Sequence, residues 1–490
     1  MKSLTYILFL LLFTVTAFAQ NKNEANKRAY ISLDLKEVLN PGDTVKIILQ
    51  HAPSYYRDAY EIVSGIVNKK SRINFNWIKL TKDSKISFSN SKIKFGLTNY
   101  RVEKGDSINV RVGIGSEGPV VLFTGKGHQK YIAKYTIDSI AKKWLADKNA
   151  ANGATFEIGE PTVAQVKDTH RKSSDRLGRQ LAGLEFFRDS IGKDAYALLK
   201  ADLIGENYRG RIKSMRLAYL LSKFNDSVRY EIEKLHDLYT PMGETEQKIF
   251  PVSDMYIVAI YDSELMKIYL ENPSNPDRGK KLYTLIKQKF TGETRNNLIV
   301  AHLLSKAIQQ NSAFDEMITD ALEVVKDANQ QEVLTMQLGI NKKGAQAFNF
   351  KLPDADNKYV SLSDYKGKVV LINYWSSTCG FCKQFDILLR EKIIPAFKGN
   401  EDVKIISINL DPNINVWRKG MADAGLDKSV NVNLFSEGLA FEHPLIKYYR
   451  INSIPWLMLI DQDGKMYKSI VTRNADAIIK DINEALNHNN

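Results

Sequence analysis

The sequence lacks cysteine almost entirely, since its 490 residues contain only Cys379 and Cys382, both within WSSTCGFCKQF (375–385). This scarcity excludes a framework of several structural disulfides, which small exported domains often need. A bridge between these two cysteines would close a very short loop and would restrict the unfolded chain little. The pair is therefore better suited to chemistry than to stabilisation.

Long apolar runs and long basic runs are also missing. Beyond the N-terminus no stretch reaches the ~18 consecutive apolar residues typical of a membrane-spanning helix. The formal net charge is +13, but the excess is spread along the chain without a basic tract. This pattern predicts a solvated basic surface and argues against nucleic-acid binding.

The N-terminus has the three parts of a secretory signal peptide. Lys2 precedes an apolar segment over 6–15, and Ala17-Phe18-Ala19 follows as a cleavage site. The segment is short for an uncleaved membrane anchor, and no cysteine near Ala19 could carry a lipid. We expect residues 1–19 to be removed, leaving an exported protein without tight membrane insertion.

Three regions follow, separated by the period of their apolar residues. Residues 29–127 alternate polar and apolar positions between turn signals such as NPGD (40–43), which predicts a β-rich domain, either a sandwich or a barrel. Residues 128–340 place apolar residues at helical spacing, which predicts a mostly α-helical region. In residues 341–490 strands and helices alternate, which predicts an α/β domain with a mixed sheet covered by helices on both faces.

An apolar strand over 368–376 leads into the two cysteines. A helix is predicted from near Cys379 through KQFDILLREKIIPAF (383–397), bent or ended at Pro395. A strand followed by C-x-x-C at the start of a helix is the thioredoxin-like redox arrangement. The helix N-terminus favours a thiolate on Cys379, which can attack, while Cys382 lies one turn further and can resolve the mixed disulfide. Gly380 and Phe381, between the cysteines, are expected to influence the redox potential.

A zinc site is the first alternative for a C-x-x-C pair. Structural zinc sites usually have four nitrogen, sulfur or oxygen ligands. The chain has no second C-x-x-C, and its C-terminal region holds only His443 and His488. The sequence therefore predicts no metal.

The C-terminal region contains the segments VVLINYWSSTCGFC (369–382), VKIISINLD (403–411) and YRINSIPWLMLIDQDGK (449–465). In these segments it resembles the exported TlpA/ResA-like thiol–disulfide oxidoreductases of the thioredoxin superfamily. The resemblance implies a cis proline at Ile454-Pro455 that turns the Ile454 backbone toward the catalytic sulfur, where an extended substrate segment can pair. It also implies that Trp375 lies under the site, and it aligns Asn373 with the buried acid of many thioredoxins.

Several positions depart from the family pattern. Thr378 and Phe381 stand where relatives most often have Trp and Pro, and Phe385 replaces a Glu thought to shuttle a proton. The proton acceptor for Cys382 is therefore unassigned, with water, Lys383 and Asp386 as options. Because Trp456 follows the proline, we expect Thr378, Phe381 and Trp456 to form an aromatic rim that prefers apolar substrate segments.

The resemblance implies a periplasmic enzyme that exchanges disulfides with protein thiols, in the reducing direction, with electrons from a membrane donor. It implies no cofactor apart from the Cys379–Cys382 disulfide. The upstream regions resemble the layout of multidomain TlpA-like proteins from Bacteroidetes, for example in LFTGKGHQKYIAKY (122–135). Three alternatives stay open: an oxidase or isomerase, a scaffold protein with a secondary redox domain, and a peroxiredoxin, in which Ser376 would fit but Ile372 replaces a required Pro.

Overall fold

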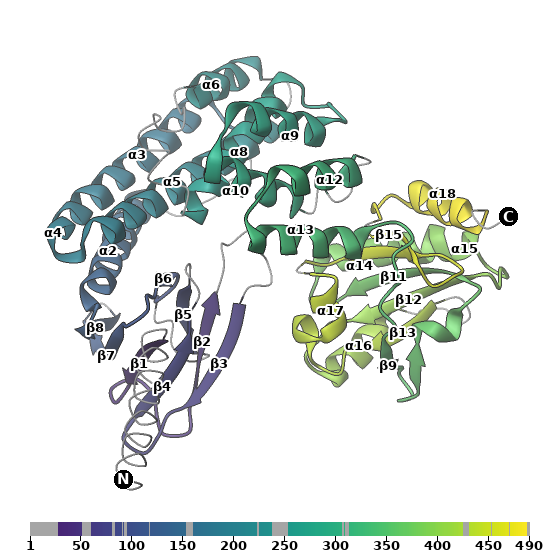
Figure 1. Ribbon diagram of the computed structural model, residues 1–490, viewed down its shortest axis with the longest axis horizontal. Coiled ribbons are helices and arrows are strands. Elements are labelled where there is room, and N and C mark those ends of the chain that lie inside the picture. The colour runs from purple at the N-terminus through teal and green to yellow at the C-terminus, as the bar shows by residue number, and fades with distance from the viewer. Residues whose placement is uncertain are drawn as a thin grey trace, which may run out of the picture. The chain divides into compact units, whose positions relative to one another are not determined.

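The architecture is described from a computed structural model (Figure 1). The described residues are 28–50, 60–80, 84–90, 92, 96–116, 118–152, 160–222, 225–237, 253–305, 308, 313–424, 431–451, 453–469 and 471–487. The predicted signal peptide, residues 1–19, lies outside them. Among the described helices, none combines the length and the apolar character that a membrane crossing requires. The chain divides into two compact units, Met1–Ser274 and Asn275–Asn490.

The first unit begins with a β-sandwich. One four-stranded sheet has the order β4-β1-β7-β8, and the other has the order β3-β2-β5-β6. Their bounds are β1 (Arg28–Asp34), β2 (Thr44–Gln50), β3 (Tyr60–Ile66), β4 (Arg72–Lys79), β5 (Lys85–Ser89), β6 (Tyr100–Arg101), β7 (Ser107–Gly115) and β8 (Gly118–Lys126). Of the two predicted forms of the β-rich domain, the sandwich is therefore the one adopted.

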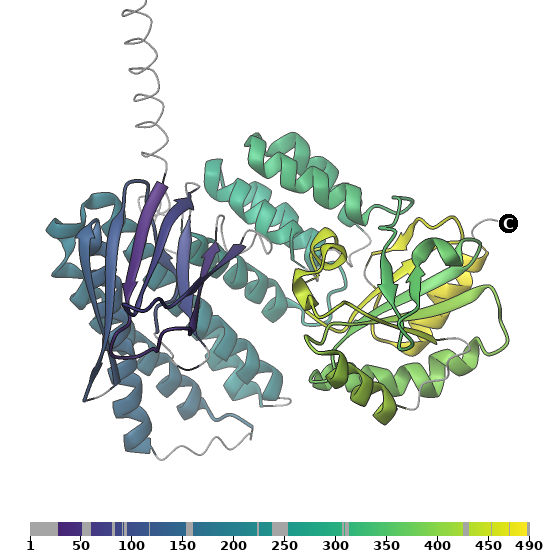
Figure 2. The same cartoon turned by 90° about the horizontal axis from the view of Figure 1, so that it is seen from below.

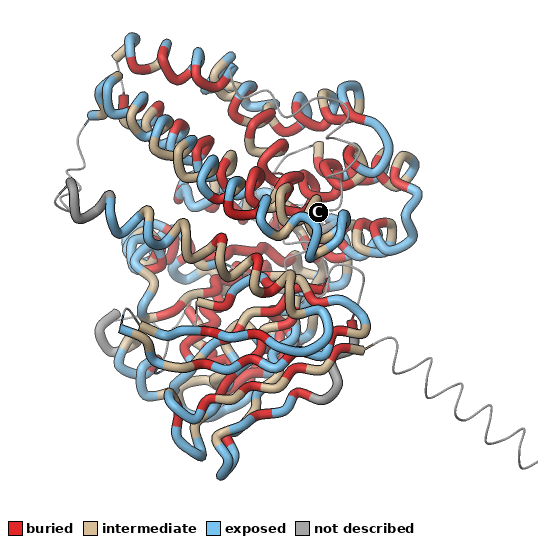
Figure 3. The backbone as a smooth tube through the Cα atoms, turned by 90° about the vertical axis from the view of Figure 1, so that its left-hand side faces the viewer, coloured by how far each residue is buried: buried red, intermediate tan, exposed pale blue. Residues whose placement is uncertain are grey.

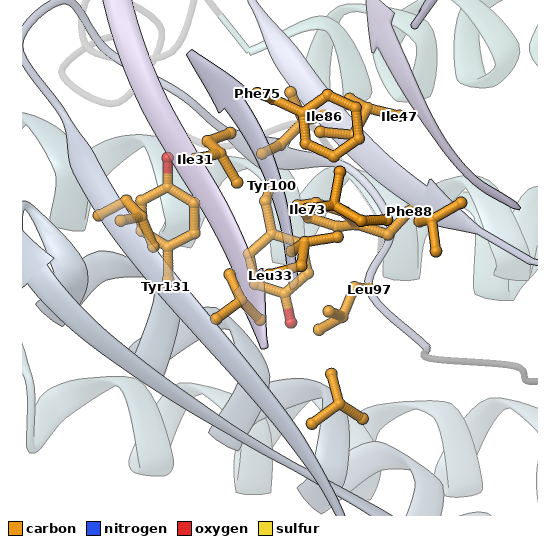
Figure 4. Packing of buried hydrophobic residues seen from close by; sticks show 14 of the residues in the cluster. Ile31, Leu33, Ile47, Ile73, Phe75, Ile86, Phe88, Leu97, Tyr100 and Tyr131 are labelled. Atoms are coloured by element: carbon orange, nitrogen blue, oxygen red, sulfur yellow. The ribbon is translucent and has the colours of Figure 1, made fainter. Parts of the chain in front are cut away.

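The core of the sandwich lies between the two sheets. Alternate residues of β1 and β2 are buried, as the period of two along a half-buried strand requires. Figure 3 shows this alternation as red and pale segments along the strands. Figure 4 shows Ile31 and Ile73 of one sheet packed close to Ile47 and Ile86 of the other, within a single apolar cluster.

Helices complete the first unit. They are α2 (His128–Asn152), α3 (Val163–Glu185), α4 (Arg188–Ile191), α5 (Lys193–Leu221), α6 (Asp226–Asp237) and α8 (Asp254–Glu271). Tyr131 of α2 closes one end of the sandwich core, which ties the helices to the β-domain. The predicted helical region continues into the second unit as α9 (Arg278–Lys289), α10 (Gly292–Leu303), α12 (Phe314–Val324) and α13 (Ala328–Asn341).

The rest of the second unit is the predicted α/β domain. Its five-stranded sheet has the order β13-β12-β11-β14-β15, in which β11, β12 and β13 are parallel and β14 is antiparallel to β11. The strands are β11 (Val369–Trp375), β12 (Val403–Asn409), β13 (Asn431–Phe435), β14 (Trp456–Ile460) and β15 (Met466–Lys468). A short hairpin of β9 (Lys351–Pro353) and β10 (Tyr359–Ser361) precedes them.

Helices cover both faces of this sheet (Figure 1, Figure 2). They are α14 (Gly380–Leu388), α15 (Ile394–Ala396), α16 (Ile414–Ala424), α17 (Pro444–Tyr448) and α18 (Ala475–Leu486). One apolar cluster joins α14 and α18 to a face of β11, and a second joins α17 to the opposite face. The first six residues of β11 are buried and only the last is partly exposed. Fixed in the core, this central strand therefore anchors the loop that follows it.

The predicted helix after the cysteines is interrupted shortly before Pro395, the residue at which the sequence predicts a bend or an end. A π-helical segment (Leu389–Ile393) separates α14 from α15, in which Pro395 occupies an early position. Proline lacks a backbone N–H and cannot continue the usual ladder of helical hydrogen bonds. The helix is therefore interrupted shortly before the residue that lacks a backbone hydrogen-bond donor, Pro395.

Candidate active site

The two cysteines lie at the junction of β11 and α14. Cys379 is the N-cap residue of α14, and its sulfur accepts a hydrogen bond from the backbone N–H of Cys382 at 3.1 Å. The two form a disulfide, with their Cα atoms 5.2 Å apart. A sulfur in this position faces the unpaired N–H groups and the positive end of the helix dipole, both of which favour a thiolate.

The two sulfurs differ in their access to solvent. Cys379 is half-buried, whereas Cys382 is only 3% exposed. Cys382 shares the inward side of α14 with Phe385, which packs into the apolar cluster against β11. One cysteine can therefore be reached by another protein, while the other is shielded behind it.

Ile454 and Pro455 lie beside Cys379, the more accessible of the two cysteines. Their peptide bond is cis, as the family resemblance implies. The carbonyl oxygen of Ile454 is 3.7 Å from the sulfur of Cys379. The two loops meet because β11 and β14 are antiparallel neighbours in the sheet. The loop that leads into β14 carries Ile454, and the loop that follows β11 carries Cys379.

The residues predicted to support the site are at several depths. Thr378, Gly380 and Phe381 are exposed, with Phe381 retaining 67% of its accessible surface. Trp375 is half-buried at the end of β11, and its carbonyl oxygen accepts the N–H of Leu410 at 2.8 Å. Trp375 is therefore less exposed than Thr378, Gly380 and Phe381.

Asn373 is buried in β11, where it is 5% exposed and pairs with Ser407 and Leu457 on the neighbouring strands. Its side-chain oxygen has no hydrogen-bond partner within the part of the chain that the structure describes. An amide cannot take up a proton near neutral pH as a carboxylate does. Asn373 can accept or donate a hydrogen bond here, but it cannot serve as the base.

Among the other options for a proton acceptor, Asp386 is the better placed. It is half-buried on α14, four residues after Cys382, and its carboxylate binds Arg390 at 3.0 Å. Burial raises the pKa of the Asp386 carboxyl, and the Arg390 guanidinium only partly offsets that effect. Lys383, by contrast, projects into solvent.

The prediction for Trp456 is wrong. Its side chain is 3% exposed and belongs to the apolar cluster on the face of the sheet opposite to α14, together with Tyr374 and Met458. Residues two positions apart in a strand point to the same face, so Trp456, the first residue of β14, lies on the same buried face as Met458. Trp456 cannot contribute its ring to a rim around Cys379.

An apolar side chain that the sequence did not indicate lies close to the site. Val416 of α16 is 42% exposed, and its carbonyl oxygen accepts a hydrogen bond from the Ser377 hydroxyl at 3.4 Å. Ser377 is two residues before Cys379, so the backbone of Val416 lies close to the loop that leads to the cysteines. No local pattern could reveal Val416, because α16 reaches this loop only through the fold.

A buried carboxylate near the site was missed as well. Asp411, two residues after β12, is 1% exposed and binds the loop between β11 and Cys379. The parallel pairing of β11 with β12 brings these loops together at one edge of the sheet. A polar side chain directly after a buried strand is the only sequence signal that could have indicated it.

The zinc site considered as an alternative requires a cluster of metal-ligating side chains. Within the ranges given above, no three His, Cys, Asp or Glu side chains come together in a way that could hold a metal ion. His443, one of the two histidines considered for zinc, instead accepts the N–H of Leu445 at 3.2 Å and caps α17. His488 lies outside the described residues.

Comparison with known proteins gives matches to the C-terminal region. Residues 343–469 match the AhpC/TSA family. The thiol–disulfide oxidoreductase ResA of Bacillus subtilis is 30% identical over 140 residues, which cover 28% of this chain and 73% of ResA. ResA of Halalkalibacterium halodurans is 29% identical over 133 residues, covering 26% and 67% of the two chains.

Two solved structures of thiol–disulfide oxidoreductases are also similar to part of this chain. The thioredoxin domain of a thiol–disulfide oxidoreductase from Bacteroides vulgatus is 23% identical, covers 29% of this chain and 97% of its own, and has a TM-score of 0.26. A thiol–disulfide oxidoreductase from Bacteroides fragilis is 21% identical, covers 28% and 98% of the two chains, and also has a TM-score of 0.26.

Proposed function

Because this chain belongs to the ResA-like family of thiol–disulfide oxidoreductases, we propose that its Cys379–Cys382 pair exchanges disulfides with protein thiols outside the cytoplasm. The observation that carries the proposal is the unequal access of the two sulfurs at the start of α14. Exchange needs one accessible thiolate and one protected thiol that acts second. The cysteines themselves carry the electrons, so the proposal needs no further cofactor.

In the reducing direction, the Cys379 thiolate attacks one sulfur of a substrate disulfide. A mixed disulfide forms, and the other substrate sulfur leaves as a thiolate. The Cys382 thiolate then attacks the Cys379 sulfur, which closes the Cys379–Cys382 disulfide and releases the second substrate thiolate. Two electrons pass from the enzyme to the substrate, and Cys382 gives up its proton before it attacks.

The backbone beside Pro455 supports a substrate-binding role for Ile454. Its carbonyl oxygen is 3.7 Å from the Cys379 sulfur, at a loop where an extended segment could add main-chain hydrogen bonds. The side chains of Phe381, between the cysteines, and of Val416, whose backbone contacts Ser377, are both exposed and favour a substrate with apolar residues beside its cysteine. Without Trp456, this apolar rim consists of Phe381 and Val416 together with the methyl group of Thr378.

The apolar rim is tested by the change Val416→Ser. Because burial of a valine side chain contributes about 1.5 kcal/mol, KM for a disulfide peptide flanked by leucines should rise about tenfold. KM for a glycine-flanked peptide should stay unchanged. An equal effect on both peptides would exclude a substrate contact.

We further propose that the enzyme is exported to the periplasm and acts in the reducing direction. The N-terminal segment 1–19 supports export, and the resemblance to TlpA/ResA-like proteins implies reduction with electrons from a membrane donor. Reduction potentials of such pairs range from about −270 to −120 mV, so the potential of Cys379–Cys382 decides between a reductase and an oxidase or isomerase. A potential near the lower end of this range is the expected value for a reductase.

Reduction of insulin by the full chain, with dithiothreitol as the electron source, tests the proposed activity. We expect rapid precipitation of the insulin B chain, and no acceleration above dithiothreitol alone for Cys379→Ser. Equal rates for the two proteins would favour the scaffold alternative and contradict the proposal.

A further inference from the structure

The turn that leads into the cysteines is held by a buried carboxylate. Asp411 accepts a hydrogen bond from the Ser376 hydroxyl at 2.7 Å and from the Ser377 backbone N–H at 3.1 and 3.2 Å. The Ser377 hydroxyl and the side-chain amide of Asn409, at 2.9 Å, also donate to it. Both carboxylate oxygens are therefore engaged, and two of their donors belong to the residue two positions before Cys379.

The anchored residues in turn determine where Cys379 lies. The carbonyl oxygen of Ser376 accepts the backbone N–H of Cys379 at 3.1 Å. The Ser376 hydroxyl is also 3.1 Å from the hydroxyl of Thr378. A continuous set of hydrogen bonds thus runs from Asp411 through Ser376 to the nucleophile.

The anchor is an ionised group at neutral pH. Burial alone would raise the pKa of the Asp411 carboxyl, but the donors Ser377, Ser376 and Asn409 lower it overall. Hydrogen bonds to an ionised acceptor are roughly twice as strong as bonds between neutral groups. Asp411 can therefore hold the turn more firmly than a neutral side chain of the same shape.

We infer that Asp411 is a positioning residue for thiol–disulfide exchange, because it fixes the 376–378 turn and thereby keeps the Cys379 sulfur at the N-terminus of α14. The inference rests on the proposed role of Cys379 as the attacking group. The favourable effect of a helix terminus on a thiolate is lost within about one turn, so the sulfur must be held in place. A looser turn would leave a smaller thiolate fraction on Cys379 at a given pH.

The inference is tested by the change Asp411→Asn in the full chain. The amide keeps the shape of the side chain, but it is uncharged and directs an NH₂ group toward donors that need an acceptor. The reduced protein is alkylated with iodoacetamide from pH 5 to 9, and the modified cysteine is located by mass spectrometry. We expect the alkylation profile of Cys379 to move to higher pH and its rate at pH 6 to fall about tenfold.

Two further variants keep the test decisive. Ser377→Ala removes one donor and should move the profile in the same direction by less, which covers the case that Asp411→Asn fails to fold. Asp461→Asn is the matched control, since Asp461 holds the β14–β15 turn by accepting the N–H groups of Asp463 and Lys465 at 3.0 and 2.8 Å. It should lower stability without moving the profile.

The outcomes separate this inference from the proposed function. An unchanged profile in both Asp411→Asn and Ser377→Ala would overturn the positioning role, as would an equal displacement in Asp461→Asn. Faster alkylation of Cys382 than of Cys379 in the unchanged protein would instead contradict the proposed function itself.

Discussion

At the scale of single residues, Trp456 and Phe381 show how burial separates two aromatic side chains near the same disulfide. Trp456 is 3% exposed in the core, whereas Phe381 is 67% exposed between the cysteines. We expect Trp456→Thr to lower the free energy of unfolding by about 3 kcal/mol, because a large core side chain is lost. Phe381→Ser should change it by less than about 0.5 kcal/mol. Urea unfolding of both variants measures this difference, and equal losses would contradict the burial.

Asp411 makes a second prediction at this scale, on the pH dependence of stability. A carboxyl whose pKa is lowered by folding contributes stability that is full above its unfolded pKa of about 3.9 and is lost as pH falls through the folded value. The difference in free energy of unfolding between the unchanged protein and Asp411→Asn should therefore be constant above about pH 5 and shrink toward pH 3. Urea titrations at four pH values measure it. A difference that grows with acid would contradict the direction of the shift.

At the scale of elements, the contact between α5 and α8 depends on a glycine. A Cβ at Gly205 would overlap the backbone of Met255 and Tyr256, whereas a Cβ at Gly210 of the same helix would meet nothing within 4 Å. Gly205→Ala should force the helices apart and destabilise the first unit. Gly210→Ala should stabilise it by about 0.5–1 kcal/mol, because alanine favours a helix. Thermal unfolding of the pair is the measurement, and destabilisation by both variants would exclude the steric cause.

The sequence predicted those elements whose pattern is local. The alternation in TVKIILQ predicted β2, and the apolar run before the cysteines predicted β11. β14 is buried at all five positions, so it offers no polar side from which the direction of Trp456 could be read. The parallel pairing of β11 and β12 is a contact between distant segments, and only that pairing brings Asp411 and the helix bearing Val416 to Cys379. The cysteines and the cis proline beside them could therefore be predicted from the sequence, while Asp411 and Val416 could not.

At the scale of the whole molecule, the two compact units have separate apolar cores. The clusters of the sandwich and of the five-stranded sheet share no residue. Calorimetry should therefore resolve two transitions, because multidomain chains usually unfold in parts. We expect Gly205→Ala to lower one transition and Trp456→Thr to lower the other. A single thermal transition, with its midpoint lowered equally by both variants, would show that the two units do not unfold independently.

The central claim is that Cys379 attacks and Cys382 resolves, and trapping of the mixed disulfide tests it most directly. The full-length Cys382→Ala and Cys379→Ala variants are each mixed with a disulfide-bonded peptide, and the covalent adducts are quantified by mass spectrometry. We expect the Cys382→Ala protein to accumulate an adduct on Cys379 and the Cys379→Ala protein to form almost none. Equal or faster adduct formation on Cys382 in the Cys379→Ala protein would contradict it.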